Sequence, residues 1–243
     1  MSLSGPDTTS STREETIAAR AAAFGSWITG FTIHSVTFEG EYRPENDDRL
    51  LLFVDALRKR PGRPANILEC GCLEGGHTLE LARQFPDATI HAVDVRQENL
   101  NETAFVVGLA NCHNVRLIQD DFDAPQATFE GHYDAVFCVR LLYHLANPRE
   151  FLERVCRASS FLRLWTVYCA EEEIAISKQS FRGRVYNEST EHPLSAARSV
   201  SFLPSLGSLI EFLWDAGYTD VRLIRKEMTK NGNGPAILLR ASR

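Results

Sequence analysis

The sequence predicts an α/β fold built on a mostly parallel sheet, and three observations support this prediction. From residue 65 onward, short apolar runs alternate with longer segments of helical pattern, as in folds whose helices connect parallel strands. The first of these runs leads directly into a glycine-rich turn. Another run, Tyr133–Val139, is apolar almost throughout, as expected for a strand that helices cover on both faces.

The first half of the sheet is expected to contain three strands separated by two helices. The strands are expected at Ala65–Glu69, Thr89–Val95 and Val115–Gln119. The helices are expected at His77–Gln84 and Glu98–Gly108. Glycine commonly follows the last turn of a helix, which makes Gly108 a suitable end for the second one.

The second half continues, after Tyr133–Val139, with a helix, a strand and another helix. Asn147 is a typical N-cap and Pro148 a typical first helical residue, so a helix is expected to begin there. A fifth strand is expected at Phe161–Ala170. The amphipathic segment Ser205–Ala216 is expected to be a helix that stops at Gly217.

The chain is expected to end in an antiparallel hairpin. Its strands, Asp220–Arg225 and Ala236–Arg240, are separated by Asn231-Gly232-Asn233-Gly234-Pro235. Asparagine, glycine and proline are typical of tight turns, so the two strands are expected to pair with each other.

The chain divides into a polar tail, a covering segment and one α/β domain. Residues 1–14 are polar and expected to be disordered. Residues 15–64 have helical patterns at Ile17–Phe24 and Asp47–Leu57 and are expected to form an N-terminal helical lid. Residues 65–243 form the expected domain. Its insertion, residues 171–204, has no clear strand pattern and is expected to be a second lid, because long irregular segments in compact domains are usually functional.

Composition disfavours several partners. The chain has 26 basic and 32 acidic residues, whereas proteins that bind long nucleic acids usually carry a basic excess. No apolar run reaches the roughly 20 residues that cross a bilayer, and the polar N-terminus does not resemble a signal peptide. The six cysteines contain no CxxC pair, which predicts reduced thiols in a cytoplasmic protein. Cys70, Cys72 and His77 lack a further ligand pair, so no metal site is expected.

The stretch from Glu69 to His77 is the most informative motif. A strand ends in an acid, and Gly71-x-x-x-Gly75-Gly76 then runs into a helix. Gly71 lets a ligand approach the backbone where a Cβ would collide with it, and the later glycines permit the turn and close packing. The spacing differs from the dinucleotide pattern G-x-G-x-x-G, and the acid would repel a phosphate. The motif therefore favours a ligand that places an amino acid or a cation here.

Two further acids follow neighbouring strands. Asp94 ends the second strand, where a carboxylate can accept hydrogen bonds from both hydroxyls of a ribose. Asp121 follows the third strand, where its carboxylate can accept a hydrogen bond from an exocyclic amine. The backbone N–H of the next residue can donate a hydrogen bond to a ring nitrogen. Its neighbour Asp120 is either solvated or a helix cap. All these groups are expected at the carboxyl edge of the sheet, where open α/β sheets bind ligands.

These residues resemble the motifs of class I S-adenosylmethionine-dependent methyltransferases. The resemblance rests on Glu69-x-Gly71-x-x-x-Gly75, Asp94, Asp121-Phe122 and Tyr143-His144-Leu145, and it covers Ala65–Ala170 well. It implies a Rossmann-like seven-stranded sheet with helices on both faces and an antiparallel last strand. A looser resemblance, to the small-molecule and tRNA-wobble-uridine carboxymethyltransferase branch, rests on His34-Ser-x-x-Phe38-x-Gly40, Leu142-Tyr-His-Leu145 and Phe202-x-Pro204.

The resemblance implies roles for the matching residues toward the cofactor S-adenosyl-L-methionine. The implied cofactor-binding residues are Glu69, Cys70, Gly71, Cys72, Gly75, Asp94, Val95, Asp121, Phe122 and Val139. The acid and the glycine turn would face the methionine, and the acid after the second strand would hold the ribose with Val95 beside the adenine. The acid after the third strand and the N–H of Phe122 would bind the adenine. Val139 and Arg140 would lie near the methionine end and the transferred methyl group.

The catalytic candidates are His144 and Tyr143. General bases are most often histidines, but a histidine in an apolar segment can equally be a core residue that donates to a backbone carbonyl. The Tyr143 hydroxyl needs a partner if it is buried, and a substrate could supply one.

The candidates for substrate binding are Arg140, Arg182, Arg184 and Tyr186. Arg140 would either hold an anionic substrate or pair with Glu69 or another acid. The other three lie in the expected lid, where the alternatives are a solvated loop and capture of a substrate anion by arginine. Trp27, Tyr42 and Arg43 would close over the cofactor from the N-terminal side, although Trp27 would fit a core equally well.

The function expected from these observations is methyl transfer to an O, N or C nucleophile of a small molecule. Three alternatives stay open: modification of a tRNA nucleoside, a non-catalytic cofactor-binding partner protein, and, disfavoured by the glycine spacing, a nicotinamide oxidoreductase. The sequence does not identify the methyl acceptor or the oligomeric state. It also leaves open whether the donor bears an extra carboxylate.

Overall fold

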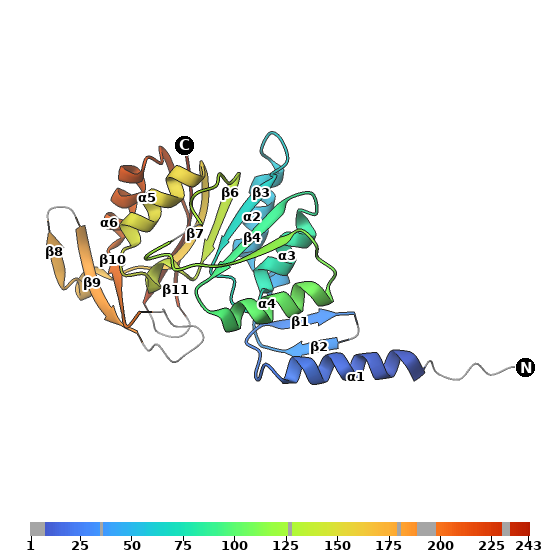
Figure 1. Cartoon of the computed structure of the whole chain (residues 1–243). Helices are drawn as coiled ribbons and strands as arrows, with labels where there is room; N and C mark the ends of the chain where they lie inside the picture. The colour runs from blue at the N-terminus through green and yellow to red at the C-terminus, as the bar shows by residue number, and fades with distance from the viewer. Residues whose placement is uncertain (1–7, 35, 126–127, 179–180, 189–197, 230–233) are drawn as a thin grey trace, which may run out of the picture.

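A seven-stranded sheet forms the centre of the molecule, with helices on both faces (Figure 1). The structure, a computed structural model, describes all residues except 1–7, 35, 126–127, 179–180, 189–197 and 230–233. The strand order is β11-β12-β7-β6-β3-β4-β5. The five parallel strands are β3 (Asn66–Cys70), β4 (Thr89–Asp94), β5 (Val115–Gln119), β6 (Ala135–Val139) and β7 (Phe161–Val167). The predicted fold class is therefore confirmed.

The last two strands form the predicted antiparallel hairpin. β12 (Pro235–Ser242) lies antiparallel to both β7 and β11 (Asp220–Met228), and β11 forms the edge of the sheet. Both strands are longer than expected, whereas β7 stops at Val167, three residues before the predicted end. The predicted turn residues 231–233 lie outside the described part of the chain.

Helices cover the two faces of the sheet in two separate hydrophobic clusters. α5 (Pro148–Ala158) and α6 (Leu206–Ala216) pack on one face, around Leu68 and Val136. α2 (Asp48–Arg58) and α3 (Gly76–Gln84) pack on the other face, around Ile67 and Phe137. Alternate residues of each strand thus face opposite clusters, as the period of a strand requires.

Helix ends follow local sequence, with one correction. Ser205 caps α6 by accepting from the N–H of Ser208, and Gly217 ends it with a φ of 110°. α4 (Gln97–Leu109) continues past Gly108, so the predicted helix end there is wrong, and Asn111 takes the positive φ instead. Asparagine tolerates this conformation better than most residues.

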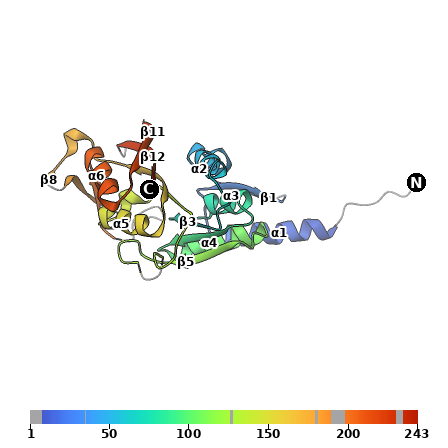
Figure 2. The same ribbon diagram turned by 90° about the horizontal axis from the view of Figure 1, so that it is seen from above.

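The N-terminal segment is only partly helical. α1 (Thr8–Ala22) includes residues 8–14, which were expected to be disordered, and a hairpin of β1 (Gly30–Ile33) and β2 (Val36–Glu39) follows it. Trp27 packs against Phe31, Phe38 and Phe105, so it is a core residue of this segment. In both views α1 lies at one end of the molecule and β8 at the other (Figures 1 and 2).

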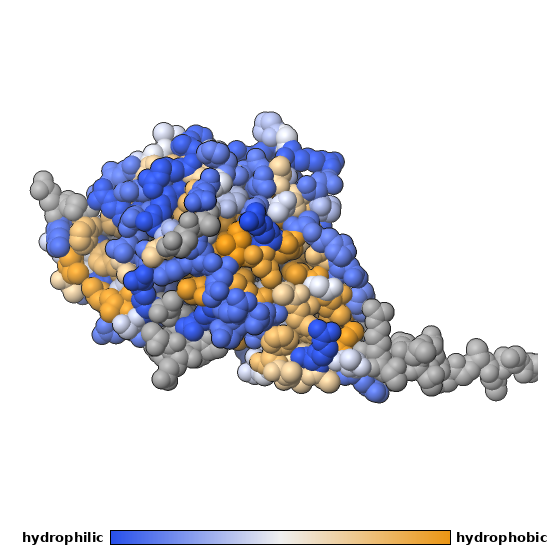
Figure 3. Space-filling view, in the orientation of Figure 1, coloured by the Kyte–Doolittle hydropathy of each residue, from blue (hydrophilic) through white to orange (hydrophobic). Residues whose placement is uncertain are grey.

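The predicted irregular insertion forms a small sheet. Its strands β8 (Ile176–Lys178), β9 (Phe181–Asn187) and β10 (Val200–Pro204) pair antiparallel. Figure 3 shows hydrophobic surface near β8 and β9, whereas the face over α5 and α6 is hydrophilic. All six cysteines are free, and none of the described helices is long and apolar enough to span a membrane.

Candidate functional site

A cavity of about 790 Å³ opens at the carboxyl edge of the parallel strands. Residues from the N-terminal segment, the ends of the strands and the insertion line it together. Seven of the residues implied to bind cofactor are among them: Gly71, Cys72, Asp94, Val95, Asp121, Phe122 and Val139. The fold thus brings one group from each of four strand ends to a single space, as expected for an open α/β sheet.

The glycine turn after β3 is shaped by its backbone. Gly71 and Gly75 have φ values of 81° and 79°, a region that residues with a side chain adopt only at a cost. Gly76 is required by packing, because a Cβ there would lie 2.7 Å from Pro44 Cγ. The turn therefore presents bare backbone at the cavity and allows the N-terminal segment to lie directly on it.

Three of the residues implied to bind cofactor do not line the cavity. Cys70 points into the core between β3 and the helices α5 and α6, and Gly75 packs against Thr103. Glu69 is buried behind the turn, where Thr78 Oγ1 donates to its Oε2 at 2.6 Å. Its Oε1 has no hydrogen-bond partner among the described residues, and burial raises the pKa of this carboxyl to about 8.

The acid at the end of β4 faces the cavity and is partly used by the protein. Asp94 Oδ1 accepts from the N–H of Arg96 and from Asn99 Nδ2, and Oδ2 accepts from the N–H of Leu73. A carboxylate offers about four acceptor positions, so Oδ2 can accept one more hydrogen bond. Asp94 therefore fixes the glycine turn and can still hold a ligand hydroxyl.

The two acids after β5 have different surroundings. Asp120 is buried and accepts from both the N–H and the hydroxyl of Thr128, so it is a loop cap. Asp121 lines the cavity and pairs with the guanidinium of Arg198, at the end of the insertion, at 2.9 Å. The N–H of Phe122 has no partner among the described residues. An acceptor and a free donor thus stand side by side, as the edge of an adenine requires.

The pair of His144 and Glu188 also lines the cavity. The short helix η2 (Leu142–His144) follows β6 and carries His144, and Glu188 follows β9 of the insertion. Nδ1 of His144 donates to Oε1 of Glu188 at 3.0 Å, and the hydroxyl of Ser201 donates to the same oxygen at 3.1 Å. This bond leaves Nε2 as the free nitrogen of the ring, so His144 can accept a proton inside the cavity.

Tyr143 is partly buried next to this pair. Its hydroxyl has no hydrogen-bond partner among the described residues, and burial raises its pKa to about 12. The phenol is therefore neutral at physiological pH and can donate a hydrogen bond to a ligand.

Arg140 is an exposed cation in the cavity, at the end of β6. Its backbone has a φ of 66°, which costs a residue with a side chain roughly 1–2 kcal/mol. The guanidinium lies 4.9 Å from the ring centroid of Tyr42 and 5.9 Å from that of Trp165. No described carboxylate pairs with it, Glu69 included.

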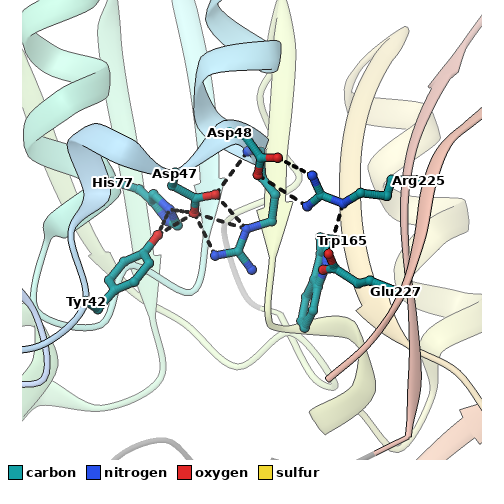
Figure 4. A network of polar contacts seen from close by, with 8 residues as sticks. Tyr42, Asp47, Asp48, His77, Trp165, Arg225 and Glu227 are labelled. Atoms are coloured by element: carbon teal, nitrogen blue, oxygen red, sulfur yellow. Dashed lines mark hydrogen bonds and ion pairs between the residues drawn. The ribbon is translucent and has the colours of Figure 1, made fainter. Parts of the chain in front are cut away.

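The rings beside Arg140 are held by two acidic side chains, the buried Asp47 and the partly exposed Glu227 (Figure 4). The hydroxyl of Tyr42 donates to Asp47, which also accepts from His77 at 2.8 Å and from Arg49 at 2.7 Å. Trp165 Nε1 donates to Glu227 at 2.6 Å. Burial alone would raise the pKa of Asp47, but hydrogen bonds and charges from His77 and Arg49 hold it well below its ordinary value.

Two of the arginines predicted to bind substrate lie outside the cavity. Arg182 and Arg184 lie on β9 and pair with Glu171 and Glu173, and neither lines the cavity. Tyr186, two residues further along the same strand, does line it. Glu188, Asp47 and Arg198 also line it and were missed, because single polar residues in loops carry no periodic pattern.

Comparisons with known proteins agree with this geometry. Residues 67–160 match a family model described as a methyltransferase domain. The tRNA U34 carboxymethyltransferase of Trichodesmium erythraeum is 24% identical over 212 residues, which are 82% of this chain and 57% of that protein. The ubiquinone biosynthesis O-methyltransferase of Vibrio parahaemolyticus is 30% identical over 121 residues, 49% of this chain and 50% of that protein. The chain thus spans little more than half the length of these curated relatives.

A solved structure resembles nearly the whole chain. The N-terminal domain of EvdMO1, crystallised in the presence of SAH and D-fucose, has a TM-score of 0.81 and 26% identity over 94% of this chain and 96% of that one. The complete EvdMO1 structure matches 94% of this chain but only 47% of its own, with a TM-score of 0.69.

The cofactor is S-adenosylmethionine, and the residues of the cavity fit it. Bare backbone follows β3, the carboxylate of Asp94 has a free acceptor position, and Asp121 and the N–H of Phe122 match an adenine edge. The buried, unpaired Oε1 of Glu69 lies behind the turn, where a positively charged ligand would favour the ionised carboxylate.

Proposed function

We propose that this chain, a class I S-adenosylmethionine-dependent methyltransferase, methylates a hydroxyl group of a small molecule. The observation that carries the proposal is the hydrogen bond between His144 and Glu188 at the wall of the cofactor cavity. An alcohol is a poor nucleophile until it loses its proton, so its methylation needs a general base in place.

The residues around this hydrogen bond have separate roles in the proposed reaction. S-adenosylmethionine supplies an activated methyl group with a neutral thioether as its leaving group. Nε2 of His144 takes the proton of the acceptor hydroxyl as the oxygen attacks, and Glu188 stabilises the resulting imidazolium. The neutral phenol of Tyr143 donates to the acceptor and helps to orient it for in-line attack.

Two relatives support a small hydroxyl compound as the acceptor. One is named an O-methyltransferase of ubiquinone biosynthesis, and the other was crystallised in the presence of the sugar D-fucose. The test has two steps. We expect S-adenosylhomocysteine, and not NAD, to raise the melting temperature of the protein. We then expect label from methyl-labelled S-adenosylmethionine on sugar or phenol hydroxyls, with a rate about 100-fold lower in His144→Ala. An equal rate in the variant would remove His144 from the mechanism.

Modification of a tRNA wobble uridine is the second candidate. It is favoured by the similarity to tRNA U34 carboxymethyltransferases over more than four fifths of the chain. The net charge of −6 disfavours it, because tRNA binding by phosphate contacts depends on basic residues. A gel shift with tRNA at low and moderate salt separates the candidates: binding at low salt that weakens with salt supports the tRNA substrate.

A further inference from the structure

Two arginines that line the cavity, Arg43 and Arg140, form no ion pair with any residue that the structure describes. Arg49, Arg198 and Arg225 also line the cavity, and each pairs with at least one carboxylate. Arg140 forms no hydrogen bond or ion pair through its guanidinium with any residue that the structure describes. Its five N–H donors therefore remain available to a ligand.

The guanidinium is fixed in place without being neutralised. It lies beside the rings of Tyr42 and Trp165, and both rings are anchored through their polar atoms, to Asp47 and to Glu227 (Figure 4). Rings attract a cation through their π faces and leave its N–H groups free. The side chain is thus oriented for binding in advance.

The backbone of Arg140 indicates that this side chain has a purpose. A glycine would adopt the φ of 66° without strain, whereas the chain has an arginine there. Strained residues of this kind cluster at ligand-binding sites. A free cation would also oppose the positive sulfonium of the cofactor, unless an anion lies between the two charges.

We propose that Arg140 binds a carboxylate group of the methyl acceptor, an inference that rests on the proposed function. A guanidinium matches a carboxylate with two parallel hydrogen bonds. The neutral hydroxyl of Tyr143, which also lines the cavity and lacks a partner among the described residues, can donate a third.

The test uses Arg140→Gly, which removes the cation and suits the left-handed backbone. Asn111→Gly is the matched control, because Asn111 has a similar φ of 55° and does not line the cavity. With S-adenosylhomocysteine bound, the dissociation constants of 4-hydroxybenzoate and 4-hydroxybenzyl alcohol are compared by calorimetry. We expect the wild type and the control to prefer the benzoate at least tenfold, and Arg140→Gly to show no preference. Equal binding of the two probes by the wild type, or a preference that survives in Arg140→Gly, would overturn the proposal.

Two further comparisons identify a carboxylate that the donor brings. The first comparison measures the affinity of the wild type for S-adenosylmethionine carboxylated on its methyl group and for the plain cofactor. If the wild type prefers the carboxylated cofactor but does not prefer the benzoate, Arg140 binds a carboxylate of the donor, and the proposal for the acceptor is overturned. S-adenosylhomocysteine is compared with 5′-methylthioadenosine, which lacks the amino acid. If Arg140→Gly binds S-adenosylhomocysteine tenfold more weakly but binds 5′-methylthioadenosine as the wild type does, the guanidinium contacts the methionyl carboxylate, and the proposal is overturned. If the wild type binds none of these nucleosides, the proposed function itself fails, and this inference falls with it.

Discussion

Nδ1 of His144 lies 3.0 Å from Oε1 of Glu188, so a residue after β6 is oriented by a residue of the insertion. The insertion therefore lines part of the cavity, through Glu188 among others. We expect Glu188→Gln to lower kcat about tenfold, because an amide stabilises an imidazolium less well than a carboxylate does. The dissociation constant of S-adenosylhomocysteine should not change.

Kinetics with two variants distinguish orientation of His144 from a structural role of Glu188. Glu188→Asp should recover part of the lost kcat, and Ser201→Ala, which removes the second hydrogen bond to the same oxygen, should have a smaller effect. A rise in KM with unchanged kcat in Glu188→Gln would contradict the assignment.

Asp121 should decide how the adenine is recognised. We expect Asp121→Asn to weaken S-adenosylhomocysteine binding about tenfold, because a hydrogen bond to a charged group contributes about 1.5–3 kcal/mol. The loss should be specific: S-inosylhomocysteine, which lacks the exocyclic amine, should bind the wild type and the variant about equally. Arg198→Ala, which frees Asp121 from an exposed ion pair, should change affinity by less than about fivefold. Equal losses for both nucleosides in Asp121→Asn would exclude the contact with the amine.

Strand positions were predictable because they follow from burial. β5 lies at the predicted residues, and β3, β4 and β6 lie within two residues of prediction. β6, which is buried throughout, fits the expectation that a strand covered on both faces is apolar. The ends of those strands fix where Asp94 and Asp121 lie, which is why these two residues were found before the structure was known.

The cavity residues that lie outside the sheet could not be predicted in the same way. Glu188 and Asp47 lie outside the sheet, and their partners are 44 and 30 residues away along the chain. Arg182 and Arg184 share a face of β9 with Tyr186, but they lie further back along the strand and pair with Glu171 and Glu173 outside the cavity. The spacing of these residues in the sequence does not show which of them reaches the cavity.

Glu69 should make the stability of the protein depend on pH. Burial raises its pKa to about 8, whereas an unfolded glutamate has a pKa near 4.5. The folded state therefore binds the proton more tightly, so the free energy of unfolding should fall as pH rises from about 5 to 8, by up to ~1.4 kcal/mol per unit. Glu69→Gln should remove this contribution. Urea unfolding of both proteins across that range measures it, and parallel curves would show that Glu69 does not titrate there.

Asp47 should be the most costly acid to replace in the N-terminal segment. It is 7% exposed and joins the start of α2 to Tyr42 and His77, and its ion pair with Arg49 is buried. Asparagine is as good an N-cap as aspartate, so the loss in Asp47→Asn reports the missing charge. We expect the free energy of unfolding, measured in urea, to fall by about 3 kcal/mol, because Arg49 is left buried without its counter-ion. The double variant with Arg49→Met should recover part of this loss. The pKa of Asp47 lies well below its ordinary value of 3.8, so its contribution is complete above that pH and is lost only as pH falls below it. A wild type and an Asp47→Asn variant of equal stability at pH 7 would show that this ion pair does not hold the segment in place.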